Sequence, residues 1–430
     1  MRRILVADDL TGASDAGVQF TKNGLRTVVW LDYDAPPADQ DADVVVVDMD
    51  SRAIPPDEAY ARMQRLLHRL RPSRPRDVVK KMDSTLRGNV GPELHALLEA
   101  LPRAFAIVCP AYPKNGRVAR EGMISVNGVR VDRSDFGRDL FSLVHDPRIA
   151  SHLWDDAIHL SLDDVRAGRE RLVGRIARAR SDGVRVAVVD AERDEDLIAL
   201  AELDDGRDDI LWVGSAGLIE MLERGEPDRG GEPERGGEPE PGANAALPAV
   251  REPVVFLIGS ISAMTQDQLA FAGEDPAFHV ALIDPVDALS GSTAFDEAVR
   301  TTALALADGK DAIIALVGER PRVEAALAEA ASCGRDARAT GAVLRERLAA
   351  TLDDLAGDGR TVVLSGGDVA RAFCQRRRIY GMRMLAETAP GIPMSRAIGA
   401  DLFLVTKAGG FGRPETYRDI VAALHQQVTT

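Results

Sequence analysis

The sequence of 430 residues has few cysteines and no long apolar run. Its three cysteines, Cys109, Cys333 and Cys374, lie far apart, which fits neither a disulfide framework nor the spacing of zinc ligands. No segment approaches the roughly 18 consecutive apolar residues of a membrane span. The apolar run near the amino terminus covers only Ile4–Ala7, which is too short for a signal peptide. These absences predict a cytoplasmic protein without a membrane partner.

Several catalytic signatures are also missing. The seven histidines are scattered without the HExxH spacing, and there is no GxSxG, GxxxxGK[ST] or GxGxxG motif. The sequence therefore supports neither a metalloprotease nor a serine hydrolase. It also contains neither a P-loop nor a dinucleotide-binding fingerprint. The formal net charge of −15 argues against a nucleic-acid partner. An anionic substrate would need a local cluster of basic residues.

Length and composition predict two domains, because 430 residues exceed one ordinary core and 45% of them are hydrophobic. Residues 224–252 repeat Gly-Glu-Pro and contain almost nothing apolar before Leu247. Such a segment cannot bury enough surface to offset the entropy of ordering it. We expect a first domain over 1–223, a disordered Gly/Pro/Glu-rich linker over 224–252 and a second domain over 253–430. A partner-binding motif is the alternative for the linker.

Apolar strands alternate with amphipathic helices in both halves, which predicts α/β domains with mainly parallel sheets. The strands expected in the first half are Arg3–Ala7, Arg26–Leu31, Val44–Asp48, Asp77–Met82, Ala104–Cys109, Val184–Asp190 and Ile210–Val213. The helices expected there include Pro56–Leu70, Pro92–Leu101 and Val165–Arg180. In the second half we expect strands over Val254–Ile258, Ala312–Leu316, Thr361–Leu364 and Leu402–Val405, and a helix over Asp336–Asp354.

The first predicted strand runs directly into a polar turn that contains Asp8, Asp9 and Thr11. In an open α/β sheet, ligands bind beyond the carboxyl ends of the strands, so this turn should face a site. Capping of the following helix is the alternative, but a cap needs only one carboxylate. The turn is therefore a candidate for substrate binding or proton transfer.

Two further turns of the first half carry charged side chains after a strand. One of them contains Lys81, Asp83, Ser84 and Arg87. Arg87 could bind a substrate carboxylate through two parallel hydrogen bonds, or it could pair with Asp83 and only hold the turn. The other turn, Pro110–Arg117, adds Asn115 and Arg117, although as a bare pattern it is an ordinary turn.

Three glycine-rich turns follow strands of the second half, at Gly259–Ser262, Ser365–Asp368 and Lys407–Gly412. Glycines let backbone N–H groups approach phosphate oxygens, and helix N-termini favour negative charge. Glycine after a strand is common, so one such turn would mean little. Three turns in one domain favour phosphate binding, and Asp368 could hold Mg²⁺.

Taken together, these motifs resemble the four-carbon acid sugar kinase family, which includes D-threonate, L-threonate and D-erythronate kinases. The markers of the resemblance are Ala7–Ala13, Asp83–Gly88, Pro110–Arg117, Gly259-Ser260 with Ser262 and Thr265, Gly366–Asp368, Pro390–Pro393 and Lys407–Gly412. The resemblance covers nearly the whole chain outside the linker. Val369 and Ala408 depart from it, because the family usually has threonine and serine there.

The resemblance implies an ATP-dependent kinase that phosphorylates a hydroxyl of a small sugar acid such as threonate or erythronate. Asp9 or Asp83 would accept the proton of that hydroxyl. Substrate binding would fall to Asp8, Thr11, Lys81, Ser84, Arg87, Asn115 and Arg117. ATP binding would fall to Ser260, Ser262, Gly366, Gly367, Asp368, Val369, Lys407, Gly409 and Gly410, with Mg²⁺ on Asp368.

Two other functions stay open at this point: a non-catalytic sensor of sugar acids and nucleotides, and a dehydrogenase or isomerase of the same acids. The missing dinucleotide fingerprint counts against a dehydrogenase. A sugar acid and ATP are the expected partners, with a homo-oligomer left open. Release of ADP with a panel of four-carbon acids would separate the alternatives.

Overall fold

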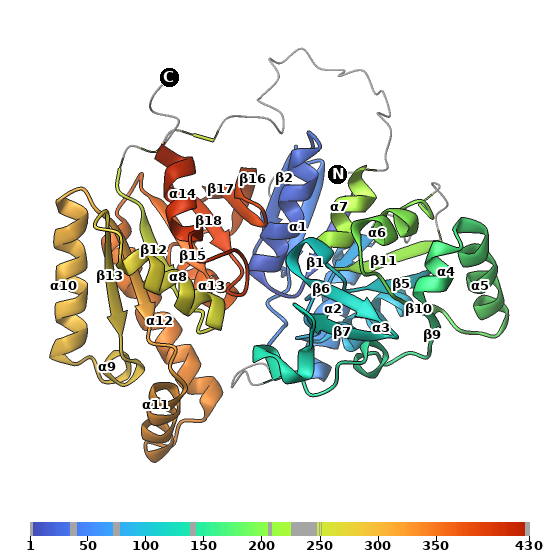
Figure 1. The fold of residues 1–430 in the computed structure, drawn as a ribbon, viewed down its shortest axis with the longest axis horizontal. Helices are drawn as coiled ribbons and strands as arrows, with labels where there is room; N and C mark the ends of the chain where they lie inside the picture. The colour runs from blue at the N-terminus through green and yellow to red at the C-terminus, as the bar shows by residue number, and fades with distance from the viewer. Residues whose placement is uncertain are drawn as a thin grey trace, which may run out of the picture. The chain divides into compact units, whose positions relative to one another are not determined.

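The structure is a computed structural model that describes residues 3–34, 41–71, 78–137, 143–204, 209–224, 247–248, 250 and 252–425. The chain divides into two compact units, Met1–Ala243 and Asn244–Thr430, and we describe each by itself. Figure 1 shows that each unit combines strands with surrounding helices. The α/β class is confirmed. Most of the expected linker over 224–252 lies outside the described residues.

The first unit is built on a parallel sheet with the strand order β2-β3-β1-β4-β11-β5-β10-β9. Its strands are β1 (Arg3–Ala7), β2 (Thr27–Trp30), β3 (Val44–Asp48), β4 (Val78–Lys81), β5 (Phe105–Cys109), β9 (Ala157–Leu160), β10 (Val186–Val189) and β11 (Ile210–Gly214). β3 and β5 are buried along their whole length. Because β3, β1 and β4 are neighbours, the turns that follow them meet at one edge of the sheet.

The helices of this unit are α1 (Leu10–Lys22), α2 (Pro56–Leu70), α3 (Val90–Ala100), α4 (Leu162–Arg166), α5 (Arg169–Ser181), α6 (Asp194–Ala201) and α7 (Ala216–Arg224). The single helix expected over Val165–Arg180 is wrong. Two helices stand there, because Gly168 adopts φ +90 and breaks the run. Short 3₁₀ turns and a small antiparallel sheet of β6 (Arg117–Arg120), β7 (Met123–Val126) and β8 (Val129–Arg130) follow β5.

The second unit has a sheet with the strand order β13-β14-β12-β15-β18-β17-β16. Its strands are β12 (Val255–Ile258), β13 (Phe278–Ile283), β14 (Asp311–Leu316), β15 (Thr361–Ser365), β16 (Gly381–Ala389), β17 (Ile392–Ile398) and β18 (Phe403–Lys407). The pairs from β13 to β18 are parallel, as expected. The antiparallel ribbon of β16 and β17, which the sequence analysis did not predict, turns at Gly391 with φ +72.

The helices of the second unit are α8 (Ala263–Gly273), α9 (Pro285–Ser290), α10 (Thr293–Ala307), α11 (Arg320–Ser332), α12 (Ala337–Ala356), α13 (Gly367–Arg376) and α14 (Thr416–His425). Its core gathers apolar side chains of β12, β14, β15 and β18 under α8 and α14. The rings of Phe256 and Tyr417 meet edge to face there, with centroids 5.5 Å apart. Among the helices of the described segments, none is long and apolar enough to cross a membrane.

Candidate functional site

The two neighbouring aspartates in the turn after β1 have different hydrogen-bond partners. Asp9 caps α1: its Oδ1 accepts the Gly12 N–H at 3.0 Å and its Oδ2 accepts the Thr11 hydroxyl at 2.7 Å. The capping alternative therefore holds for Asp9 and occupies Thr11. Asp8 is buried at 2% exposure and makes its side-chain contacts with an arginine that the sequence analysis did not single out.

That arginine is Arg52, which lies in the turn after β3. Its Nε and Nη2 donate to the two Asp8 oxygens at 2.7 and 2.9 Å. The same Nη2 lies 2.7 Å from Asp9 Oδ1 and 3.5 Å from Asp83 Oδ1. One guanidinium thus bridges carboxylates from the turns after β1 and β4, and the three neighbouring strands β3, β1 and β4 each contribute to one charge cluster.

Asp83 also pairs with Arg87. The Arg87 Nε lies 3.0 Å from Asp83 Oδ2, and its Nη2 lies 2.9 Å from Asp83 Oδ1. Asp83 also accepts the backbone N–H and the hydroxyl of Thr85. The structure therefore shows the paired arrangement that was the alternative for Arg87. Arg87 keeps a side-chain exposure of 23%, against 14% for Arg52.

The charges of this cluster keep the carboxylates of Asp8 and Asp83 ionised. Burial alone would raise the pKa of the Asp8 carboxyl, but the attraction of Arg52 outweighs it and lowers that pKa. At Asp83 burial acts the same way, and Arg87 with Arg52 holds the pKa well below its usual range. At neutral pH the cluster is a set of fixed, alternating charges.

Lys81 and Arg117 extend this cluster. The Lys81 amine donates to the Met82 carbonyl at 2.9 Å. A Cβ on Gly12 would lie 2.8 Å from that amine and 2.7 Å from Asp9 Oδ1, so glycine is needed for their close approach. Arg117 begins β6 and is 5% exposed. Burial lowers the pKa of Arg117, and the charges of Asp83 and Arg87 also act on it.

Ser84 and Asn115 complete the residues expected in the first unit. Ser84 is buried in the same turn as Asp83, with an exposure of 7%. Asn115 ends a short 3₁₀ turn, and its backbone carbonyl accepts a hydrogen bond from the Arg117 guanidinium. The backbone of Asn115 thus contacts the Arg117 side chain.

In the second unit, the three glycine-rich turns lie together because β12, β15 and β18 are neighbours. The Gly259 N–H donates to the Ser365 carbonyl at 2.9 Å, and the Gly366 N–H donates to the Lys407 carbonyl at 3.0 Å. Ser262 caps α8 by accepting the Thr265 N–H. A Cβ on Gly409 would overlap the Ser260 hydroxyl, so the first and third turns touch.

The Gly409 carbonyl is held by donors from behind the turn. It accepts the Ser262 hydroxyl at 3.0 Å, the Thr265 hydroxyl at 3.1 Å and the Lys407 amine at 3.1 Å. The same amine also donates to the Ala408 carbonyl at 3.1 Å. In a trans peptide the C=O and N–H point in opposite directions, so the N–H groups of Gly409 and Gly410 point away from Lys407. Burial lowers the pKa of Lys407 to about 7.

The turn after β15 leads into α13, where Gly366 adopts φ +109 ahead of Gly367 at the helix start. Asp368 lies in the first turn of α13 with 56% side-chain exposure, and one of its oxygens is 3.3 Å from Arg345. Val369 is buried. A Cβ added to Gly259 would lie 2.9 Å from the Cβ of Val369, so the two residues pack closely. Within the described residues no group of three or more His, Cys, Asp or Glu could hold a metal ion.

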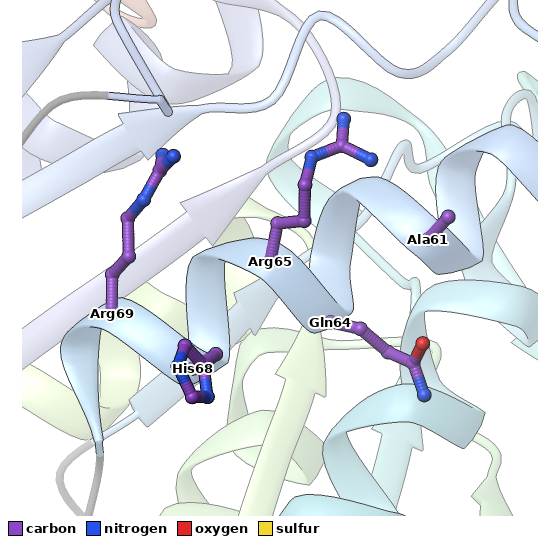
Figure 2. A pocket seen from close by; sticks show the side chains of 5 residues that line it. All are labelled: Ala61, Gln64, Arg65, His68 and Arg69. Carbon is purple, nitrogen blue, oxygen red and sulfur yellow. The ribbon is translucent and has the colours of Figure 1, made fainter.

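An open hollow lies elsewhere, on the exposed side of α2 (Figure 2). It is lined by Ala61, Gln64, Arg65, His68 and Arg69. None of these residues belongs to the charge cluster of the first unit or to the glycine-rich turns of the second. The Arg69 guanidinium pairs with Asp34 at 2.9 Å, and both side chains are more than 40% exposed. Exposed pairs of this kind contribute little free energy, so we assign the hollow no function.

Comparisons with known proteins agree with the division into two site types. Residues 3–222 match the family described as "Sugar-binding N-terminal domain", and residues 255–417 match "Nucleotide-binding C-terminal domain". The chain is thus a protein with one sugar-binding and one nucleotide-binding domain. A D-threonate kinase of Cupriavidus necator is 33% identical over 96% of this chain and 95% of its own. A 3-oxo-tetronate kinase of the same organism is 33% identical over 97% and 96%.

A solved structure supports the fold. The crystal structure of a putative tRNA synthase from Salmonella typhimurium LT2 matches with a TM-score of 0.74 at 23% identity, covering 99% of this chain and 100% of the other. At this identity the likeness shows the fold alone. With the two matched domains and the full-length relatives, the chain belongs to the four-carbon acid sugar kinase family.

Proposed function

We propose that this protein transfers the terminal phosphoryl group of ATP to a hydroxyl of a small sugar acid with four carbons. The observation that carries the proposal is the separation of two chemistries between two matched domains. The sugar-binding domain holds the charge cluster around Arg52, and the nucleotide-binding domain holds the three adjoining glycine-rich turns. Relatives over nearly the full length are kinases of threonate and 3-oxo-tetronate.

The cationic groups of the first domain suit an acid substrate. Phosphoryl transfer depends on positioning and on charge neutralisation more than on covalent chemistry. Arg87 is the more exposed of the two guanidiniums on Asp83, so we assign it to the substrate carboxylate while it keeps its contact with Asp83. Lys81 and Arg117 add positive charge, and Asp8, Thr11, Ser84 and Asn115 supply the polar groups for the substrate hydroxyls.

Asp9 is our choice for the proton acceptor. Asp83 is the weaker candidate, because Arg87 and Arg52 hold its pKa well below the usual range and so lower its affinity for a proton. Asp9 is 9% exposed. Because Gly12 has no side chain, the Asp9 Oδ1 and the Lys81 amine both lie close to the Gly12 Cα. A hydroxyl placed between Asp9 and Lys81 would meet an acceptor and a positive charge together.

The second domain has the groups needed to bind a nucleoside triphosphate. Backbone N–H groups of Gly367 and Gly409, with the hydroxyl of Ser260, would bind phosphate oxygens. Gly366 and Ser262 would shape the cradle, because the Gly366 N–H donates to the Lys407 carbonyl and the Ser262 hydroxyl donates to the Gly409 carbonyl. Val369 packs behind this cradle and Lys407 supports it. Mg²⁺ commonly takes one or two protein carboxylates and completes its shell with phosphates and water, so Asp368 alone fits that role. The ion would supply positive charge to neutralise the transferred phosphoryl group.

The direct test is release of ADP with ATP, Mg²⁺ and a panel of four-carbon sugar acids, followed by analysis of the product. Neutral tetritols serve as controls. We expect turnover with at least one acid and little with the tetritols. Asp9→Asn should lower kcat about 100-fold or more with a modest change in KM. Asp368→Asn should weaken binding of Mg²⁺-ATP. Absence of ADP release with every acid would contradict the proposal.

A further inference from the structure

A fully buried ion pair lies directly beneath the charge cluster of the first domain. Lys80 belongs to β4 and Glu93 to the first turn of α3. The Lys80 amine is 2.8 Å from Glu93 Oε2, and both side chains have 0% exposure. Lys80 precedes Lys81, yet neither Lys80 nor Glu93 can touch solvent or a ligand. Their role therefore follows from their contacts with Ser51 and with the Lys81 carbonyl.

We infer that the Lys80–Glu93 pair positions the Arg52 turn against the aspartates that Arg52 bridges. Glu93 Oε1 accepts the hydroxyl of Ser51, the residue before Arg52. The Lys80 amine donates to the Lys81 carbonyl at 2.7 Å, at the point where the chain leaves β4 toward Asp83. The pair therefore joins the segment that carries Arg52 to the segment that carries Asp83.

Asn89, next to the start of α3, holds the same turn from the side. Its side-chain amide donates to the Ser51 carbonyl at 2.7 Å and to the Ile54 carbonyl at 2.9 Å. The backbone N–H groups of Ser51 and Arg52 donate to the Asp8 carbonyl at 2.9 and 3.2 Å. The Arg52 turn is thus fixed to the chain after β1 by its backbone, and to β4 and α3 through buried polar side chains.

Stability alone does not explain such a pair. Replacing a buried ion pair by apolar side chains of similar volume is often neutral or stabilising, because burying two charges is costly. Charged hydrogen bonds are directional, however, and fix the geometry of the groups that they join. A shift of about 1 Å at a binding group can cost a factor of about 100 in rate. We therefore assign Lys80 and Glu93 as positioning residues for the acid site, an inference that rests on the proposed function.

The test compares the wild type with the double variant Lys80→Met/Glu93→Leu. We expect a thermal unfolding midpoint close to that of the wild type, a KM for the acid raised at least about 10-fold, and an unchanged KM for ATP. The control is Arg3→Met/Asp204→Leu, which removes an ion pair of 3.6 Å at the opposite end of β1. This control should leave both KM values unchanged.

A double variant that folds with a wild-type KM and kcat for the acid would overturn the inference. If the double variant does not fold, Ser51→Ala decides instead, because it removes only the hydroxyl that links the turn to Glu93. It should raise the KM for the acid several-fold with only a modest fall in unfolding midpoint, because Glu93 keeps its pair with Lys80. A wild-type KM would refute the positioning role.

Failure of the proposed function can be told apart from failure of this inference. If the wild type itself shows no turnover, crystal structures of wild type and variant still test the inference. It predicts that Arg52 loses its contacts with Asp8 and Asp83 in the variant, and retained contacts would overturn it.

Discussion

Removal of Arg52 should disturb both the stability and the chemistry of the first domain. Arg52→Met takes away the guanidinium that lies within 2.7 to 3.5 Å of Asp8, Asp9 and Asp83. Removing one partner of a buried ion pair costs about 3–5 kcal/mol, because a charge is left buried without compensation. Arg87 still neutralises Asp83 in the variant, so we expect about 3 kcal/mol, mostly from Asp8.

The loss should depend on pH in a direction that follows from the carboxylates. In the wild type the pKa of Asp8 is lowered, so its contribution to stability is present above the unfolded value near 3.8 and disappears as the pH falls through the folded pKa. Without Arg52, only Lys80 and Lys81 oppose the effect of burial, so we expect the pKa of Asp8 in the variant to lie above that of the unfolded chain. The penalty in the variant is then largest at neutral pH and shrinks as the carboxylate takes up a proton. The stability difference should be smaller at pH 4.5 than at pH 7.

Urea unfolding followed by tryptophan fluorescence measures this difference cleanly. The chain has three tryptophans, Trp30, Trp154 and Trp212, and all of them lie in the first unit. Arg69→Met is the matched control, since its pair with Asp34 is exposed and should change stability by less than about 1 kcal/mol at either pH. A loss for Arg52→Met that is equal at pH 7 and pH 4.5, with an unchanged KM for the acid, would refute the reasoning.

Three further predictions concern single side chains. Arg87→Ala should lower kcat/KM for the best acid at least about 10-fold, since a charge-assisted hydrogen bond contributes about 1.5–3 kcal/mol; unchanged preference for acids over tetritols in a folded variant would contradict this role. Lys407→Met should weaken ATP binding in calorimetry. It should also abolish the rise in stability from about pH 7 to 10.5, because the unfolded lysine binds a proton there that the folded one has lost. Finally, a maleimide at pH 8 should label the exposed Cys333 in the native protein; Cys374 is buried, and burial raises the pKa of Cys109 to about 12.

Much of the first domain's site follows from the sequence, because strand ends can be located from local patterns. The sequence predicts that the polar turns after β1 and β4 both serve substrate binding or proton transfer, and the structure brings Asp8, Asp9 and Asp83 to one guanidinium. Arg52 was missed although Asp48-Met49-Asp50-Ser51-Arg52 is an equally polar strand end. The missing knowledge was strand order: only the adjacency of β3, β1 and β4 shows that this turn belongs to the same site.

The other misses have similar physical causes. The role of Glu93 leaves no local pattern in the sequence, because its partner Lys80 lies on a strand and the two residues pair across elements. The ribbon of β16 and β17 was missed although Pro390-Gly391 marks its turn. Local propensity favoured one helix across Gly168, and the left-handed conformation of that glycine ended it.

The bridging contacts of Arg52 have a consequence for how such a site can diverge. Arg52 contacts Asp8, Asp9 and Asp83 together, and its loss leaves Asp8 buried without its main partner, so substitutions at these four positions should be coupled in their effects on stability. Gly88 is constrained as well, because a Cβ there would lie 2.8 Å from Asp8 Oδ2. Evolution of a new acid preference has a freer path through the periphery, for example Phe136, whose ring lies 5.0 Å from the Arg87 guanidinium. Drift in specificity should therefore accumulate around an invariant electrostatic centre.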